Sequence, residues 1–340
     1  MTSLMLRTFL LSATVALAAC ESSPQSADIS GPSAATPVPP SVSSSIGAFA
    51  SSGHAGLDAW RDEFAVRARN AGHQIQTIRS ILEGIEPMSV FLERSSEAVD
   101  QVEFSKPIWE YVDDTVSQRR LTNGRERLAA DSSLFGALET TYGVQREYLV
   151  AIWGMETSYG GYIGDFDAPS ALASMAAEGR RRSFAERELL ALMTILENGD
   201  AYRHELIAGW AGAMGQTQFM PTTYVAYAVD WTGDGTKDVW RARADALASA
   251  GNYLSASGWR PGEPSLVEVV LPQNFDYALA NGVDRPTQFW QQIGIVPANR
   301  LNLDPAGVGE SELWLPAGAT GPAFLLYPNF DVIKTYNRAD

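Results

Sequence analysis

The sequence predicts a mainly α-helical domain with a small β-sheet in its C-terminal part. Apolar residues recur at helical spacing early in the chain, beginning with Leu57, Trp60, Phe64 and Ala68. After Gly258 the pattern changes to short β-like runs, SLVEVVLP, ELWLP and AFLLYPNF, which proline and glycine separate. The chain has 340 residues and a hydrophobic content of 45%, which suffices for one large domain or two small ones.

Helix boundaries follow from glycine, proline and capping residues. Ser183 and Glu186 predict a capping box at the start of a long helix that Gly199 closes. The same signals predict helices over 55–72, 75–85, 105–116, 132–142, 145–158, 183–199 and 245–258.

The first residues are organised like a targeting segment. Arg7 supplies a positive charge, residues 8–17 are mostly apolar, and small residues precede Cys20, the only cysteine of the chain. The stretch Leu-Ala-Ala-Cys resembles a bacterial lipoprotein box, which implies a signal peptide over 1–19 and lipidation of the Cys20 thiol. An ordinary signal peptide is the alternative. Residues 20–54, rich in Ser, Pro and Ala, are expected to form a lipidated cysteine and a flexible linker.

The formal charge of −15 excludes nucleic acid as a partner, because no basic stripe is available to neutralise phosphates. A neutral sugar polymer is compatible with this charge.

One carboxylate lies inside an apolar, aromatic run, AIWGMETSYGGYIG, at residues 151–164. On a helix, Glu156 shares one face with Leu149, Ile152 and Trp153. Two interpretations are open: a core glutamate paired with an arginine, or a carboxyl whose charged form is disfavoured by desolvation. The second carboxyl would keep its proton near neutral pH and act as a general acid.

Other catalytic systems have little support. His54, His73 and His204 are scattered without metal-ligand spacing, so each is expected to be structural. No G-x-S-x-G, H-E-x-x-H or phosphate-loop motif occurs. Acid–base chemistry by a carboxyl is therefore the main option.

Several long motifs carry a family resemblance. AIWGMETSYG, GWAGAMGQTQFMPTTYVAYAVDWTGDG and DALASAGNYLSASGWRPGE resemble, in this order, segments of the B-type membrane-bound lytic murein transglycosylases. The resemblance extends from about residue 56 to the C-terminus and includes GPAFLLYPNFDVIKTYN. It implies a lysozyme-like fold and a catalytic domain over 55–340.

The resemblance also implies a reaction. The family cleaves the β-1,4 bond between N-acetylmuramic acid and N-acetylglucosamine in peptidoglycan without water. A single glutamate protonates the glycosidic oxygen and then takes the proton of the muramic 6-hydroxyl, which closes on the anomeric carbon and leaves a 1,6-anhydro end. The match assigns this role to Glu156, so a second carboxylate is dispensable and the chemistry needs no cofactor.

Substrate contacts are implied as well. Arg180 and Arg181 match a family arginine pair that could meet carboxylates of the peptide stem, and a solvated helix start is the alternative. Ser170 stands where the family often has Asp. The remaining matched positions are Met214, Gln218, Phe219, Tyr253, Tyr336 and Asn337, for which core packing is the alternative.

The stretch DWTGDGTKD resembles the opening of an EF-hand loop with Gly235 at position six. Position twelve is Arg241 instead of glutamate, and an Asp-Gly turn without metal is the alternative. The expected ligands of a structural calcium ion are Asp230, Thr232, Asp234, Thr236 and Asp245, with Asp238 as a substitute.

Two rival functions stay open. Asp165 and Asp167 would support a muramidase that uses water, if one of them lay about 5–10 Å from Glu156. A non-catalytic peptidoglycan-binding lipoprotein is the other. The expected partners are peptidoglycan strands and, through the lipid anchor, the membrane. We expect a monomer in the periplasm, anchored to the outer membrane because Glu21 follows the cysteine.

Overall fold

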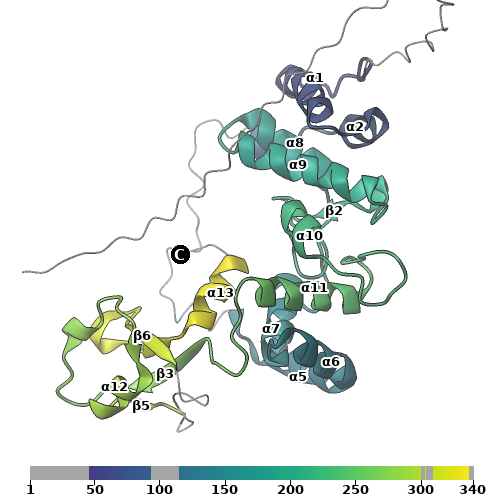
Figure 1. The fold of residues 1–340 in the computed structure, drawn as a ribbon. Helices are drawn as coiled ribbons and strands as arrows, with labels where there is room; N and C mark the ends of the chain where they lie inside the picture. Colours follow the sequence, from purple (N-terminus) through teal and green to yellow (C-terminus); the bar gives the residue numbers. More distant parts are fainter. Residues whose placement is uncertain (1–45, 93–114, 300–302, 304–308, 337–340) are drawn as a thin grey trace, which may run out of the picture. The chain divides into compact units, whose positions relative to one another are not determined.

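The computed structural model describes residues 46–92, 115–299, 303 and 309–336, which belong to one compact unit beginning at Ile46 (Figure 1). The predicted signal peptide, Cys20 and residues 105–114 of the helix expected over 105–116 lie outside the described residues. The helices that concern the site are α1 (Ala55–Asn70), α2 (Ile75–Leu82), α5 (Gln118–Ala130), α6 (Ser132–Tyr142), α7 (Arg146–Thr157), α8 (Ala168–Glu178), α9 (Arg182–Glu197), α10 (Pro221–Tyr227), α11 (Arg243–Ala256) and α13 (Pro328–Tyr336). Short helices also occur at α3 (Ser89–Leu92) and α12 (Thr287–Gln292).

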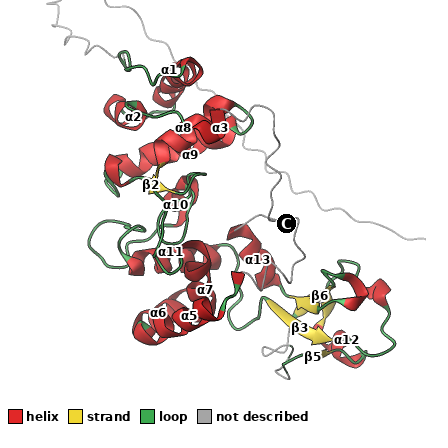
Figure 2. Ribbon diagram, turned by 180° about the vertical axis from the view of Figure 1, so that it is seen from behind, coloured by secondary structure: helices red, strands yellow, loops and turns green. Residues whose placement is uncertain are grey.

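A first helical group packs α1 and α2 against α8 and α9, as both ribbon views show (Figure 1, Figure 2). The apolar stripe predicted on α1 is buried here, since Leu57, Trp60 and Phe64 all lie in the core of this group. No helix in the described ranges is both long enough and apolar enough to cross a bilayer. The buried stripe of α1 shows that its helical pattern contributes to a packed core.

The start of α9 differs from the predicted capping box. Arg181 is the N-cap residue and makes no side-chain capping bond. The Glu186 carboxylate instead accepts hydrogen bonds from Trp60 Nε1 at 2.9 Å and from Arg67 Nη2 at 2.7 Å. The Glu186 carboxylate therefore binds to α1 and does not form the predicted capping box.

Residues 46–54, which the sequence assigns to a flexible linker, belong to the folded unit. The ring of Phe49 lies under the guanidinium groups of Arg61 and Arg79, at 4.8 and 5.1 Å from the ring centroid. Arg79 Nη1 also donates to the backbone carbonyl of Ile46 at 2.9 Å. Two arginines of α1 and α2 thus hold the segment in place, so the domain begins before residue 55.

A second helical group consists of α5, α6, α7 and α11 around a separate core. Phe135, Leu149 and Trp153 are buried in it, and Leu254 of α11 completes the packing. This group holds α7, the helix that carries Glu156, at the positions predicted within two residues of each end.

The C-terminal part contains the expected small sheet. Five antiparallel strands follow the order β4-β6-β7-β3-β5. The run AFLLYPNF is predicted as one strand, but only Ala323–Leu326 forms a strand, because Pro328 begins α13. The strands are β3 (Leu266–Val270), β4 (Arg285–Pro286), β5 (Val296–Pro297), β6 (Glu310–Trp314) and β7 (Ala323–Leu326).

Candidate active site

Glu156 lies in the last turn of α7, on the side that faces the protein. Leu149 and Trp153 are buried, and Glu156 itself is only partly exposed. Burial raises the pKa of the Glu156 carboxyl to about 7, from an ordinary value of 4.5. Among the residues that the structure describes, no arginine or lysine pairs with this carboxyl, and no donor hydrogen-bonds to it. The raised pKa and the lack of a cationic partner among the described residues favour one of the two interpretations of Glu156. They favour a desolvated carboxyl that can act as a general acid over a core glutamate paired with an arginine.

A pocket of about 580 Å³ collects five of the predicted substrate residues. They come from the start of α9, from the turn before α10, from α11 and from α13 (Figure 1). Its lining residues are Arg181, Phe184, Arg187, Glu188, Gln218, Phe219, Met220, Thr222, Thr223, Tyr253, Thr335 and Tyr336. A pocket with aromatic rings, amides and two arginines can bind an amphiphilic ligand that carries both sugar faces and anionic groups.

Tyr336 connects this pocket with Glu156. Its ring packs against Phe219 and Tyr253, with centroids 5.9 and 5.5 Å away, and its hydroxyl donates to the Thr217 carbonyl at 2.7 Å. Burial raises the pKa of the Tyr336 hydroxyl well above its ordinary value, and the negative charge of Glu156 raises it further. The hydroxyl therefore stays protonated and donates to the Thr217 carbonyl. Asn337 lies outside the described residues.

A tight turn sets the positions of Met214, Gln218 and Phe219. The backbones of Met214 and Phe219 exchange hydrogen bonds of 2.8 and 2.9 Å. The turn between them places Gln218 at a φ of 50°, and Gln218 Nε2 donates to the carbonyls of Gly215 and Ile163. Met214 is fully buried and does not line the pocket, whereas Gln218 and Phe219 do.

The two predicted arginines have different surroundings. Arg180 is exposed and forms an ion pair with Glu178, two residues before it in the sequence. Arg181 lines the pocket, with its guanidinium 4.3 Å from the centroid of the Phe184 ring. Only Arg181 therefore belongs to the group that the structure brings together.

Two further charged residues of the pocket were missed by the sequence analysis. Glu188 is buried and accepts hydrogen bonds from the backbone and hydroxyl of Thr222, at 2.8 and 2.9 Å. It lies on the apolar stripe of α9 next to Leu189, a pattern that would have marked it as buried. Arg187 is exposed on the same helix, and no sequence signal distinguishes it from a surface residue.

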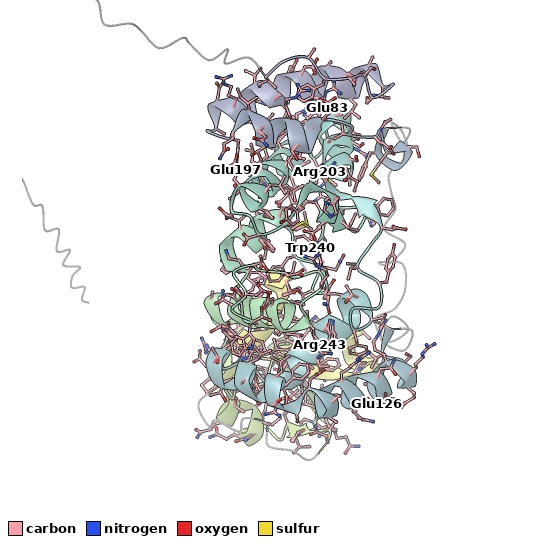
Figure 3. The ribbon with its side chains drawn as sticks, turned by 90° about the vertical axis from the view of Figure 1, so that its right-hand side faces the viewer. Glu83, Glu126, Glu197, Arg203, Trp240 and Arg243 are labelled. Carbon is pink, nitrogen blue, oxygen red and sulfur yellow. The ribbon has the colours of Figure 1, made fainter. Side chains whose placement is uncertain are left out.

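The candidate second carboxylates are bound to other partners. Asp167 caps α8 by accepting a hydrogen bond from the Ser170 backbone at 2.9 Å, and it is paired with Arg203, which is labelled in Figure 3. Burial acts to raise the pKa of Asp167, but the hydrogen bonds from Arg203 and Ser170 outweigh it and hold the pKa below its ordinary value. Asp165 accepts a hydrogen bond from the exposed Tyr162 hydroxyl at 3.0 Å. Both carboxylates have structural roles.

Ser170, the departure from the family pattern, shares the carboxylate of Asp167. Its hydroxyl donates to Asp167 Oδ2 at 2.6 Å and accepts from the backbone of Glu86 at 3.0 Å. The serine therefore links the start of α8 to the segment after α2.

Comparison with known proteins agrees with this geometry. Residues 56–340 match the family described as transglycosylase SLT domain. The chain belongs to this transglycosylase family. Membrane-bound lytic murein transglycosylase B of Escherichia coli (strain K12) is 34% identical over 203 residues, which cover 58% of this chain and 54% of that protein. The chain thus spans about half the length of this curated relative.

Solved structures of the transglycosylase family confirm the lysozyme-like, mainly helical fold class. SltB3 from Pseudomonas aeruginosa, in complex with NAG-NAM-pentapeptide, matches with a TM-score of 0.76 and 40% identity, covering 84% of this chain and 76% of that chain. Slt35 from Escherichia coli, in complex with calcium, matches with a TM-score of 0.67 and 25% identity, covering 82% of this chain and 88% of that chain.

The EF-hand-like loop at residues 230–238 carries carboxylate and hydroxyl oxygens, the kind of donor that calcium prefers. Burial raises the pKa of the Asp245 carboxyl. This carboxylate accepts backbone hydrogen bonds from Trp231, Thr232 and Asp238, at 3.0 Å each, and so ties the loop to α11. Asp230 also accepts backbone hydrogen bonds from Gly233 and Gly235, at 2.6 and 2.8 Å. Within the described ranges no three acidic, histidine or cysteine side chains converge, so hydroxyl and carbonyl oxygens would have to complete the site. The donor set fits a structural calcium ion in its chemistry.

The three histidines of this chain make contacts that support the fold, as predicted. His54 caps the start of α1. His73 Nδ1 lies 3.0 Å from Glu197 Oε2, and the His204 ring stacks on Tyr202. None of the three lines the pocket that contains Tyr336.

Proposed function

We propose that this chain is a peptidoglycan lytic transglycosylase in which Glu156 is the single acid and base. The observation that carries the proposal is a carboxyl in the last turn of α7 whose pKa is raised to about 7 by burial, without a cationic partner in the described part of the chain. Family membership and the sugar–peptide ligand named for the SltB3 structure support a glycan substrate.

The reaction begins with the protonated carboxyl of Glu156. It donates its proton to the oxygen between N-acetylmuramic acid and N-acetylglucosamine while the bond from that oxygen to the muramic anomeric carbon breaks. The carboxylate left behind is poorly solvated and therefore a stronger base than an ordinary carboxylate. It takes the proton of the muramic 6-hydroxyl, whose oxygen forms the new bond to the anomeric carbon. The products are a free 4-hydroxyl and a 1,6-anhydro end, and Glu156 regains its proton.

The pocket supplies contacts to the substrate in this proposal. Because both N–H groups of the Gln218 amide donate to backbone carbonyls, its side-chain oxygen is the atom that can accept from a hydroxyl or from the N–H of an N-acetyl group. The rings of Phe219 and Tyr253 cover sugar faces. Arg181 and Arg187 offer guanidinium groups to the carboxylates of a peptide stem.

Product analysis by mass spectrometry tests the reaction type. Digestion of purified murein is expected to give 1,6-anhydro ends, and the Glu156→Gln variant is expected to give no products while it still sediments with murein. Reducing muramic ends would indicate the muramidase, which the structural roles of Asp165 and Asp167 disfavour. Binding without products from the wild type would indicate the non-catalytic protein.

We place the protein in the periplasm, attached to the outer membrane through a lipid on Cys20, and we take it to act as a monomer. The lipoprotein-like stretch before Cys20 and the membrane-bound relative support this placement. Radiolabelled palmitate is expected to enter the full chain and to be lost in Cys20→Ala. A wild-type protein without label, recovered in the soluble fraction, would contradict the anchor.

A further inference from the structure

Gln216 forms hydrogen bonds with two residues in the last turns of α7 and does not line the substrate pocket. Gln216 lies in the turn between Met214 and Phe219 and is buried. Gly215 permits its position, because a Cβ there would lie 2.6 Å from the Val239 carbonyl oxygen. The turn therefore sits directly against the segment around Val239, and its backbone has no room to shift.

Every polar group of Gln216 has a partner. Its backbone N–H donates to the Val239 carbonyl at 2.9 Å, and its backbone carbonyl accepts from Thr157 Oγ1 at 2.7 Å. In the side chain, Oε1 accepts from the Trp153 indole Nε1 at 3.1 Å, and Nε2 donates to the Trp240 carbonyl at 3.2 Å. Because an indole N–H is only a donor and a carbonyl only an acceptor, these two partners fix the orientation of the amide.

Two of these partners flank the acid. Trp153 precedes Glu156 by three residues and Thr157 follows it directly, and both are buried. The Thr157 hydroxyl also accepts from the backbone of Gly160 at 3.0 Å, which closes the loop after the helix. A Cβ at Gly160 would lie 2.6 Å from Gln216 Oε1, so this loop also packs closely on the same amide.

The same turn also fixes other parts of the site. The carbonyl of Thr217 accepts the Tyr336 hydroxyl, and Gln218 faces the pocket. On its far side the amide of Gln216 is bonded to Trp240, a buried residue that is labelled in Figure 3. The Trp240 indole donates to the Ile207 carbonyl at 2.9 Å. One turn therefore relates the acid, the tyrosine and the substrate pocket to each other.

We propose that Gln216 is a positioning residue, which holds the turn of α7 carrying Glu156 in register with the substrate pocket through the Trp153 indole and the Thr157 hydroxyl. The inference rests on the proposed function of Glu156. Misplacing a reacting group by about 1 Å costs on the order of 100-fold in rate. The loss should appear in kcat and leave KM nearly unchanged, because Gln216 does not line the substrate pocket.

Gln216→Met tests the inference, since methionine has a similar shape but no amide. On murein glycans we expect kcat to fall about 30- to 100-fold with KM within about twofold. The alkaline limb of the pH profile should move to lower pH, because a displaced Glu156 becomes more hydrated. In spectra of protein with ¹⁵N-labelled indoles, the Trp153 resonance, assigned through Trp153→Phe, should lose its hydrogen-bonded shift. The matched control is Gln76→Met, an exposed glutamine of α2, which should change none of these readouts.

A double-mutant cycle separates positioning from a general loss of stability. If Gln216 acts through the Trp153 indole, the double variant Gln216→Met with Trp153→Phe should lose no more kcat than the worse single variant. Additive losses, an unchanged kcat, or a raised KM with unchanged kcat would overturn the inference. Failure of the proposed function is a different result, because the wild type itself would then release no anhydro ends.

Should Gln216→Met not fold, Gln216→Glu takes its place. A protonated carboxyl keeps an acceptor for the Trp153 indole and a donor for the Trp240 carbonyl. The activity of this variant relative to the wild type should therefore fall as the pH rises and the new carboxyl ionises. A ratio that stays constant over the pH range would contradict the role of the amide.

Discussion

Replacing Glu156 with glutamine should make the protein more stable at alkaline pH, although it removes activity. The folded-state pKa of Glu156 is about 7, and the ordinary value that applies to the unfolded chain is 4.5. Below the ordinary value both states are protonated, so burial has no electrostatic cost. Between pH 4.5 and 7 the carboxyl ionises in the unfolded chain but keeps its proton in the folded state, so the folded state loses stability relative to the unfolded state over this range. Above pH 7 the carboxyl is ionised in both states, and the full cost of holding the charge where it is poorly solvated remains.

The size of this effect follows from the difference between the two pKa values. Each pKa unit corresponds to about 1.4 kcal/mol, so the full penalty is about 3 kcal/mol, reduced to about 2 to 3 kcal/mol because the side chain is partly exposed. Glutamine has nearly the same shape and cannot ionise. The gain in the free energy of unfolding should therefore be close to zero at pH 4 and reach this value above pH 8.

Urea unfolding of both proteins at several pH values between 4 and 9 measures the difference. Other titrating groups occur in both proteins and cancel in the comparison. The matched control is Glu126→Gln, an exposed glutamate of α5, whose difference should stay within about 0.5 kcal/mol at every pH. If the difference in the free energy of unfolding between the wild type and Glu156→Gln does not change with pH, the claim that this carboxyl is desolvated is refuted.

Three further predictions concern activity and the metal loop. Because Glu156 must carry a proton to cleave the bond, kcat should fall about tenfold per pH unit above pH 7, and a flat profile to pH 9 would contradict its role. Arg181→Ala should raise KM about tenfold on glycans with peptide stems and leave KM on stem-free glycans unchanged, whereas equal effects on both would exclude a stem contact. Excess calcium should raise the midpoint of thermal unfolding over EDTA by about 5 °C, and Asp230→Asn should remove that difference; an identical midpoint in calcium and EDTA would exclude the ion.

The surroundings of Glu156 show what can be predicted from residues that are close together in the sequence. Its helix, its neighbours Leu149 and Trp153, and their common buried side all follow from spacing within about two turns. The same holds for the sheet strands, whose short apolar runs end at proline or glycine. The family, too, could be identified from contiguous motifs.

Three errors of the sequence analysis have two different causes. Glu186 reaches α1 instead of its own cap, residues 46–54 are held by arginines of α1 and α2, and Pro328 begins a helix within a strand-like run. In the first two cases a local pattern competed with a contact from a distant segment, and the distant contact prevailed. At Pro328 the reason is local, because proline is suited to the first position of a helix.

The sequence by itself determined α1, α2, α6, α7, α9 and α11, three strands of the sheet and the candidate acid, because these depend on residues close together along the chain. It did not predict α5, α8 or α10. Only the tertiary structure decided that Arg181, Gln218 and Tyr336 share a pocket while Met214 is buried. It alone gave Gln216 its contacts with both neighbours of the acid. The physical reason is that desolvation and hydrogen-bond partners are set by whichever segments pack against a side chain, and those segments come from remote parts of the chain.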